Sequence, residues 1–170
     1  SIRLKETRVP QNLIKRLEQE GKLKKQKAGI VQVEALLRES ILDLKEAVQI
    51  VDIADRATYL LAYNAMLKAG RALLLWHGYR PDDGAQHKTV VELTAAFLGD
   101  RFQSLTQHFE TMRRKRNEMT YEAGTLLSKT EVRQSFDDAV MLVQEIYREV
   151  KAKDPQFELD FNFDKKGRGP

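Results

Sequence analysis

The residues with the clearest chemical potential lie between Met112 and Tyr121, in the stretch Met-Arg-Arg-Lys-Arg-Asn-Glu-Met-Thr-Tyr. Apolar side chains recur before and within this stretch at alternating steps of three and four residues, which is the pattern of a helix face that packs against other helices. These apolar residues are Phe102, Leu105, Phe109, Met112 and Met119. Arg116 stands where the same pattern predicts a further apolar residue.

An arginine at this position needs a partner, because a guanidinium group keeps its proton and is costly to leave desolvated and unpaired. The partner could be a carboxylate, another chain or a phosphate. The alternative is a structural role, in which Arg116 reaches water at the edge of a bundle or pairs with an internal Asp or Glu. Arg113 and Asn117 are close to Arg116 along the helix, and Tyr121 follows just over one turn later. We therefore take this cluster as the candidate functional site.

The sequence lacks the residues that several other common types of active site require. The chain has no cysteine, which excludes thiolate metal sites and cysteine nucleophiles, and no glycine-rich phosphate loop or Gly-x-Ser-x-Gly turn. His77, His87 and His108 are scattered, without metal-ligand spacing, so we expect no metal and no cofactor. The turn between His77 and His87 could bring these two side chains together, although an isolated histidine at a helix end is usually structural.

The elements that must hold the candidate site are helices. We expect a first helix opened by Pro10, then helices over residues 28–53, 56–77, 86–98 and 102–121, and a last one from Ser128 or Thr130 to Pro155. Asp52 or Asp55 is the expected cap of the second long helix. Because residues 56–77 are apolar nearly all round, this helix should form the centre of an all-α, antiparallel up-and-down bundle of about five helices.

The polar residues of the central helix, Asn64, Lys68 and Arg71, share one face. That face either looks into a groove or is simply exposed to solvent. Outside the bundle (residues 28–153) we expect a basic helical arm over residues 1–27 and an extended tail over residues 154–170. The four apolar residues from Phe157 to Phe163 alternate with polar ones, so the tail could lie across its own bundle or dock on another chain.

The charge and composition of the chain indicate which classes of binding partner are expected. The net charge is +4 over 170 residues, and residues 1–27 alone hold nine Lys or Arg and three Glu. A basic arm together with the run from Arg113 to Arg116 suits a phosphate-rich partner, although a solvated arm would look the same. The chain has no apolar run of membrane-spanning length, so we expect a cytoplasmic protein with no membrane association.

Several short segments occur in an order that is found in one known family. They are Ala62-Tyr63-Asn64-Ala65, Ala72-Leu73-Leu74, Gly78-Tyr79-Arg80-Pro81, His87 with Val90, and the stretch from Arg114 to Tyr121. Together they make residues 28–150 resemble the HEPN domain (higher eukaryotes and prokaryotes nucleotide-binding). The resemblance implies a helical bundle that dimerises, and in many members a metal-independent endoribonuclease. Such members often act as toxins and are paired with a nucleotidyltransferase antitoxin.

The family motif is an arginine, usually a polar residue, three further residues and then a histidine. Arg116 and Asn117 match its first two positions, and Tyr121 stands where the histidine is expected. A second register begins at Arg114 and places Met119 at the histidine position. The motif histidine is missing in both registers, and tyrosine is a poor proton acceptor near neutral pH unless its pKa is shifted.

Two functions remain open from the sequence. The first is a HEPN-like RNA-binding protein, or a metal-independent endoribonuclease toxin with weakened or lost activity, from a toxin–antitoxin or defence system. By the resemblance, Arg116 would bind the scissile phosphate, Asn117 would orient it and Tyr121 would replace the motif histidine. Arg113 and Arg114 would bind the flanking phosphates. The second is a non-catalytic dimeric interaction module that binds a protein such as a nucleotidyltransferase through its tail or basic arm.

Overall fold

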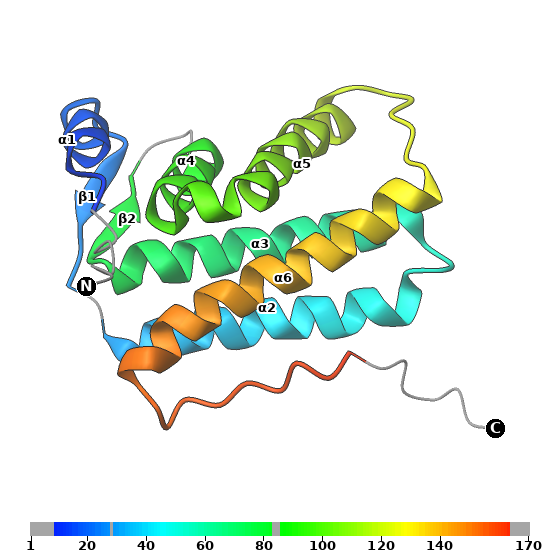
Figure 1. The fold of residues 1–170 in the computed structure, drawn as a ribbon. Helices are drawn as coiled ribbons and strands as arrows, with labels where there is room; N and C mark the ends of the chain where they lie inside the picture. The colour runs from blue at the N-terminus through cyan, green and yellow to red at the C-terminus, as the bar shows by residue number, and fades with distance from the viewer. Residues whose placement is uncertain (1–8, 28, 83–85, 164–170) are drawn as a thin grey trace.

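A computed structural model of the protein describes residues 9–27, 29–82 and 86–163 (Figure 1). Its main helices are α2 (Ile30–Ile50), α3 (Asp55–Trp76), α4 (Gln86–Leu98), α5 (Gln103–Tyr121) and α6 (Lys129–Lys153). A shorter helix, α1 (Gln11–Gln19), lies at the N-terminal side, and a 3-10 turn over Asp100–Phe102 leads into α5. The predicted all-α bundle is confirmed.

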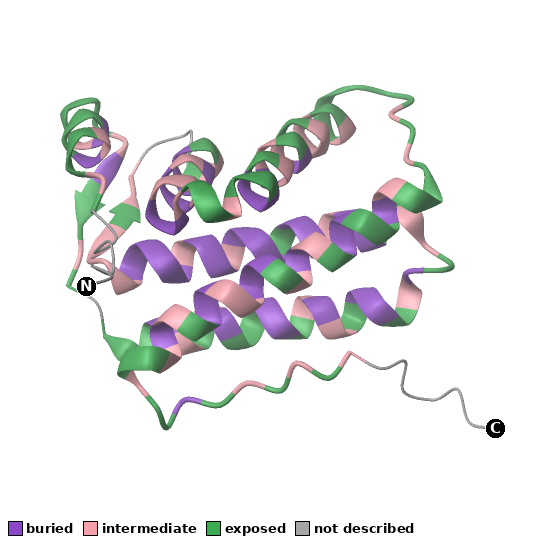
Figure 2. Ribbon diagram, in the orientation of Figure 1, coloured by how far each residue is buried: buried purple, intermediate pink, exposed green. Residues whose placement is uncertain are grey.

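The centre of the bundle is α3. It packs against α2 and α6 on one side and against α4 and α5 on the other, so it is surrounded by helices (Figure 1). Figure 2 shows buried residues along its whole length, and Tyr59, Tyr63, Met66, Leu73 and Leu74 are among the largest fully buried side chains. The apolar composition of residues 56–77 therefore predicted this position correctly.

The sequence did not predict a small antiparallel sheet. β1 (Leu23–Lys25) pairs with β2 (Tyr79–Pro81), and Leu23 lies opposite Pro81. Strands of three residues are too short to show an alternating pattern, and the pairing joins segments far apart in the sequence. The segment after α3, which we expected to be only a turn, thus contributes the strand β2. Gly78 immediately precedes this strand and has a φ of 88°, which glycine adopts without strain.

The N-terminal arm is docked onto the bundle as far as it is described. Ile14, Leu17 and Leu23 are buried in the same core as the long helices. Residues 1–8, which carry part of the predicted basic arm, lie outside the described residues. So do residue 28, residues 83–85 of the turn and residues 164–170 of the tail.

The helix ends confirm one predicted cap and correct another. Ser128 caps α6, because its hydroxyl oxygen accepts a hydrogen bond from the Glu131 N–H at 3.1 Å. Neither aspartate caps α3: Ala54 holds the cap position without a side-chain bond. The carboxylates of Asp52 and Asp55 instead meet α6, through Arg133 at 3.1 Å and Lys129 at 3.5 Å.

The described part of the tail lies along its own bundle, below α2 and α6 in Figure 1. Phe157 is buried, and its carbonyl oxygen accepts a hydrogen bond from the Tyr147 hydroxyl at 3.0 Å. The same hydroxyl oxygen accepts the Leu159 N–H at 3.2 Å, and the Phe161 ring lies 5.1 Å from the Tyr147 ring. Of the two predicted positions for the tail, the structure supports packing within the chain. No helix in the described residues has both the length and the apolar character needed to span a membrane.

Candidate functional site

The predicted apolar face of α5 turns inward, as its spacing requires. Leu105, Phe109 and Met112 are buried, and Phe102 and Met119 pack against the core from its edge. Arg116 is partly buried at the position that the pattern assigns to an apolar residue. The helix therefore carries a guanidinium group into the boundary between α5 and the rest of the bundle.

Arg113 and Arg114 share one carboxylate. Arg113 donates two hydrogen bonds to the Glu110 carboxylate, at 2.9 and 2.7 Å, and Arg114 donates a third at 2.9 Å. The hydrogen bond from Arg113 is the main reason that the pKa of Glu110 lies below its ordinary value. The charge of Glu110 is thus divided between two arginines, of which Arg113 is the less exposed.

Arg116 has no such partner. Among the described residues, no carboxylate forms an ion pair with its guanidinium group. The groups on which its charge acts are Tyr63 of α3 and His87 of α4, and for both it is the strongest of the neighbouring charges. Pairing with an internal Asp or Glu is therefore excluded within the described chain. Contact with water, a phosphate or another chain remains.

Tyr63 and His87 are joined by a hydrogen bond. The Tyr63 hydroxyl oxygen and His87 Nδ1 are 2.9 Å apart, and the two rings lie 5.8 Å apart. Burial raises the pKa of Tyr63 to about 12, against the opposing charges of Arg116 and Arg113. Burial also lowers the pKa of His87, and the charges of Arg116, Arg71 and Arg113 lower it further. His87 is therefore a neutral imidazole at neutral pH.

Arg71 brings a third guanidinium group to this place. Its Nη2 donates to Gln86 Oε1 at 3.3 Å, while its Nε is buried without a hydrogen-bond partner in the described structure. The predicted polar face of α3 is divided, because Lys68 turns to α2 and lies 2.8 Å from the Asp43 carboxylate. We refer to Arg71, Arg113 and Arg116 as the arginine cluster.

The remaining motif residues do not converge on Arg116 within one chain. Tyr121 is the last residue of α5 and is 82% exposed. It is five positions after Arg116, which places the two side chains about 140° apart around the helix axis. Asn117 is partly buried beside Arg116. In the second register Arg114 is exposed, and Met119 packs against the core.

The pairing of His87 with Tyr63 was not predicted from the sequence. His77 does not pair with His87, since the His77 ring stacks on the Phe97 ring with the centroids 4.0 Å apart. The third histidine, His108, pairs with Asp138 at 2.5 Å. One signal could have pointed to His87: a tyrosine within a fully buried helix needs a polar partner for its hydroxyl group. In the described residues no group of three or more acidic or histidine side chains is placed to hold a metal ion.

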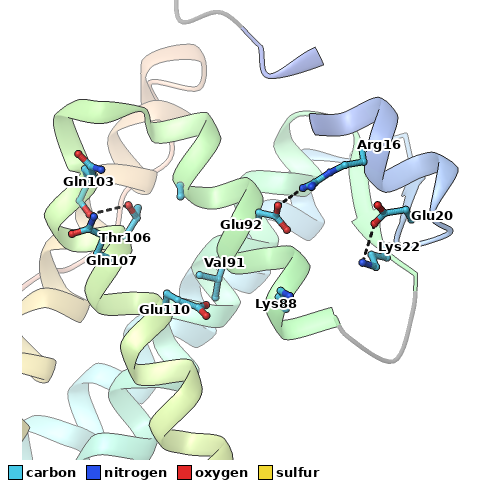
Figure 3. Close-up of a pocket in the computed structure, with 11 residues that line it drawn as sticks. Arg16, Glu20, Lys22, Lys88, Val91, Glu92, Gln103, Thr106, Gln107 and Glu110 are labelled. Atoms are coloured by element: carbon cyan, nitrogen blue, oxygen red, sulfur yellow. Dashed lines mark hydrogen bonds and ion pairs between the residues drawn. The ribbon is translucent and has the colours of Figure 1, made fainter. Parts of the chain in front are cut away.

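A cleft of about 460 Å³ lies beside the arginine cluster, between α1, α4 and α5 (Figure 3). Its charged side chains are mixed, and opposite charges meet: Arg16 pairs with Glu92, and Lys22 lies 2.9 Å from Glu20. Glu110 also lines the cleft but is held by Arg113. Because these charges largely cancel, the cleft does not select an ion of either sign, and Arg116 and His87 do not line it.

The pairing of Glu110 predicts an acid-sensitive contribution to stability. A carboxyl group whose pKa is lowered in the folded state stabilises the fold above its ordinary pKa of about 4.3, and this contribution is lost as the pH falls through the lower pKa. Glu110→Gln should therefore flatten the loss of stability below about pH 5 in urea unfolding. Glu122→Gln, at an exposed position just beyond α5, is the control. If the free energy of unfolding of Glu110→Gln falls below about pH 5 as steeply as that of the native protein, the role of the Arg113 contact is contradicted.

Comparison with known proteins finds no matching family model, no matching curated protein and no matching solved structure.

Proposed function

We propose that the protein is a HEPN-like RNA-binding protein whose arginine cluster holds the phosphates of an RNA strand. The observation that carries this proposal is the partly buried Arg116, which has no carboxylate partner among the described residues. A guanidinium group in that position is stabilised by an anion, and a phosphate accepts its paired N–H donors well.

The local charge supports an anionic ligand. Arg71, Arg113, Arg114 and Arg116 carry four positive charges, and Glu110 is the one carboxylate that pairs with them in the described structure, which leaves three positive charges uncompensated. The buried Nε of Arg71 is a further donor without an acceptor. Extended polyanions bind such surfaces through several phosphates at once, with a strong dependence on salt.

The choice of RNA rests on the resemblance of residues 28–150 to the HEPN domain, in which Arg116 and Asn117 match the motif. In this proposal two chains form a homodimer, with their α5 helices facing each other across a shared cleft. A nucleotidyltransferase antitoxin would be the protein partner in a toxin–antitoxin or defence system. The alternative of a non-catalytic module that docks through its tail receives no support from the packing of Phe157 within its own chain.

Arg116→Ala should weaken the binding of single-stranded RNA roughly tenfold or more, since a charge-assisted hydrogen bond contributes about 1.5–3 kcal/mol. It should also reduce the slope of log K against log salt by about 0.7, because one phosphate contact is lost. Fluorescence anisotropy at several salt concentrations measures both quantities. Arg116→Lys keeps the charge but loses the paired donors, so it should lie between the native protein and Arg116→Ala.

The matched control is Arg148→Ala, which removes the same charge from an exposed position on α6 where Arg148 pairs with Glu145. Its RNA affinity should stay close to that of the native protein. If Arg116→Ala and Arg148→Ala weaken binding equally, only the net charge matters and the proposed site is wrong. If the native protein does not bind RNA, the proposed function is wrong.

A further inference from the structure

The candidate site has no histidine at the motif position of α5, and Glu110, the carboxylate of α5 that bonds Arg113 and Arg114, is a weak base because the hydrogen bond from Arg113 lowers its pKa. Cleavage of RNA through its own ribose requires a group that removes the proton of the 2′-hydroxyl, and a side chain with a pKa near the working pH does this best. Tyr121 is 82% exposed and lies about 140° around the helix from Arg116. We therefore consider a group from another element for this step.

The side chain of His87 is oriented by Tyr63 of α3, which in turn packs against α5. Its Nδ1 lies 2.9 Å from the hydroxyl oxygen of Tyr63, whose side chain is fully buried. The Tyr63 ring in turn lies 6.0 Å from the ring of Phe109 on α5. The orientation of the imidazole is thereby fixed, and Nε2 is the ring nitrogen that carries no hydrogen bond in the described structure.

The hydrogen bond between Tyr63 and His87 is compatible with either neutral tautomer of the imidazole. The Tyr63 hydroxyl keeps its proton at neutral pH, because burial raises the pKa of Tyr63 to about 12. A protonated hydroxyl group can either donate its proton to His87 Nδ1 or accept the Nδ1–H of His87. Proton acceptance by Nε2 requires the second arrangement, which leaves the lone pair on Nε2.

The surrounding charges set the state of His87 before and after an anion binds. The titratable and charged groups that act on it are Tyr63 and Arg71 from α3 and Arg113 and Arg116 from α5. Burial and then the charges of the three arginines lower the pKa of His87 and keep the free imidazole unprotonated. A phosphate bound to these arginines adds negative charge, which raises the pKa of His87 and favours its acceptance of a proton.

We propose that His87 is the catalytic base of this site and replaces the histidine that is missing from α5; this rests on the proposed RNA binding. His87 Nε2 takes the proton of the 2′-hydroxyl, and the 2′-oxygen attacks the adjacent phosphorus atom, whose negative oxygens Arg116 holds. The bond between phosphorus and the 5′-oxygen breaks, and the leaving oxygen takes a proton from water. The products are a 2′,3′-cyclic phosphate and a 5′-hydroxyl end, and His87 returns its proton to solvent.

The test combines binding and cleavage of a labelled single-stranded RNA of mixed sequence, without added metal. His87→Gln should bind this RNA as the native protein does, because the arginine cluster remains, but its cleavage rate should fall by a factor of about 100 or more. The same RNA with 2′-deoxyribose should bind and stay intact. His108→Gln, which removes a histidine of α5 that pairs with Asp138 of α6, is the control and should cleave at the native rate.

A second measurement does not depend on cleavage. The pKa of His87, followed by NMR of the imidazole signals, should rise when inorganic phosphate is added, and this rise should disappear in Arg116→Ala. Tyr63→Phe keeps the ring and removes the hydroxyl oxygen, so it should alter the tautomer signal of His87 and reduce cleavage more than binding.

The outcomes separate the two proposals. RNA binding that depends on Arg116, with no cleavage or with equal cleavage by His87→Gln, overturns the role of His87 and leaves the proposed function standing. Cleavage that is lost in Tyr121→Phe but kept in His87→Gln assigns the proton to Tyr121 and overturns the inference. RNA binding that is absent from the native chain overturns the proposed function itself.

Discussion

Phe109→Ala is expected to destabilise the protein by about 3–5 kcal/mol, the range for removing a fully buried phenylalanine ring. Phe109 is 0% exposed and its ring lies 6.0 Å from that of Tyr63, so it joins α5 to the central helix. Removing the ring leaves a cavity that rigid helices on either side close only in part. The change is measured by urea unfolding, and the melting temperature should fall by roughly 10 °C or more.

Tyr121→Ala provides a control for this substitution. It also replaces an aromatic residue of α5 by alanine, but Tyr121 is 82% exposed, so the free energy of unfolding should change by no more than about 0.5 kcal/mol. Equal losses in Phe109→Ala and Tyr121→Ala would contradict the buried position of Phe109. A loss below about 1 kcal/mol in Phe109→Ala would show that the surrounding side chains collapse into the cavity.

The helices could be predicted from the sequence because their signal is local. Apolar residues repeat every three to four positions, and glycine, proline and capping residues mark the ends, so α4 begins and ends where the pattern predicts. The unusual position of Arg116 could be predicted for the same reason. A charged residue in a series of apolar residues is recognised from the spacing within its own helix.

The partners of these residues could not be predicted, because they depend on how the helices cross. Tyr63 and His87 are separated by a turn, and only the packing of α4 on α3 brings them to 2.9 Å. The same reason explains the wrong cap of α3, since Asp52 and Asp55 meet basic residues of α6 rather than their own backbone. The sequence therefore predicted which residues are chemically unusual but not which of them share a site.

Gly70 of α3 lies against side chains of both α4 and α5. A Cβ atom at this position would lie 2.7 Å from Val90 Cγ1, 2.8 Å from Thr94 Oγ1 and 3.7 Å from Phe109 Cε2. The first two distances are shorter than real Cβ contacts, so either α4 or its side chains would have to move. Only glycine fits here without displacement, although alanine is the better helix former by up to about 1 kcal/mol.

Gly70→Ala is therefore expected to destabilise the protein by about 1–3 kcal/mol, as overpacking of a core does. Asn64→Ala, at an exposed position on the same helix, should be neutral or slightly stabilising, which separates the steric effect from helix propensity. Val90→Ala removes the methyl group nearest to the new Cβ. The double variant should consequently be more stable than the sum of the two single changes predicts, by at least about 0.5 kcal/mol.

The same substitutions connect packing with the candidate site. α4 carries Val90 and Thr94 against Gly70 and also presents His87 to Tyr63, so a displacement of α4 should change the hydrogen bond to His87 Nδ1. Gly70→Ala should shift the imidazole NMR signals of His87, and the addition of Val90→Ala should return them toward their native positions. Signals that stay unchanged in a destabilised Gly70→Ala protein would mean that Val90 and Thr94 yield locally and that the start of α4 keeps its place.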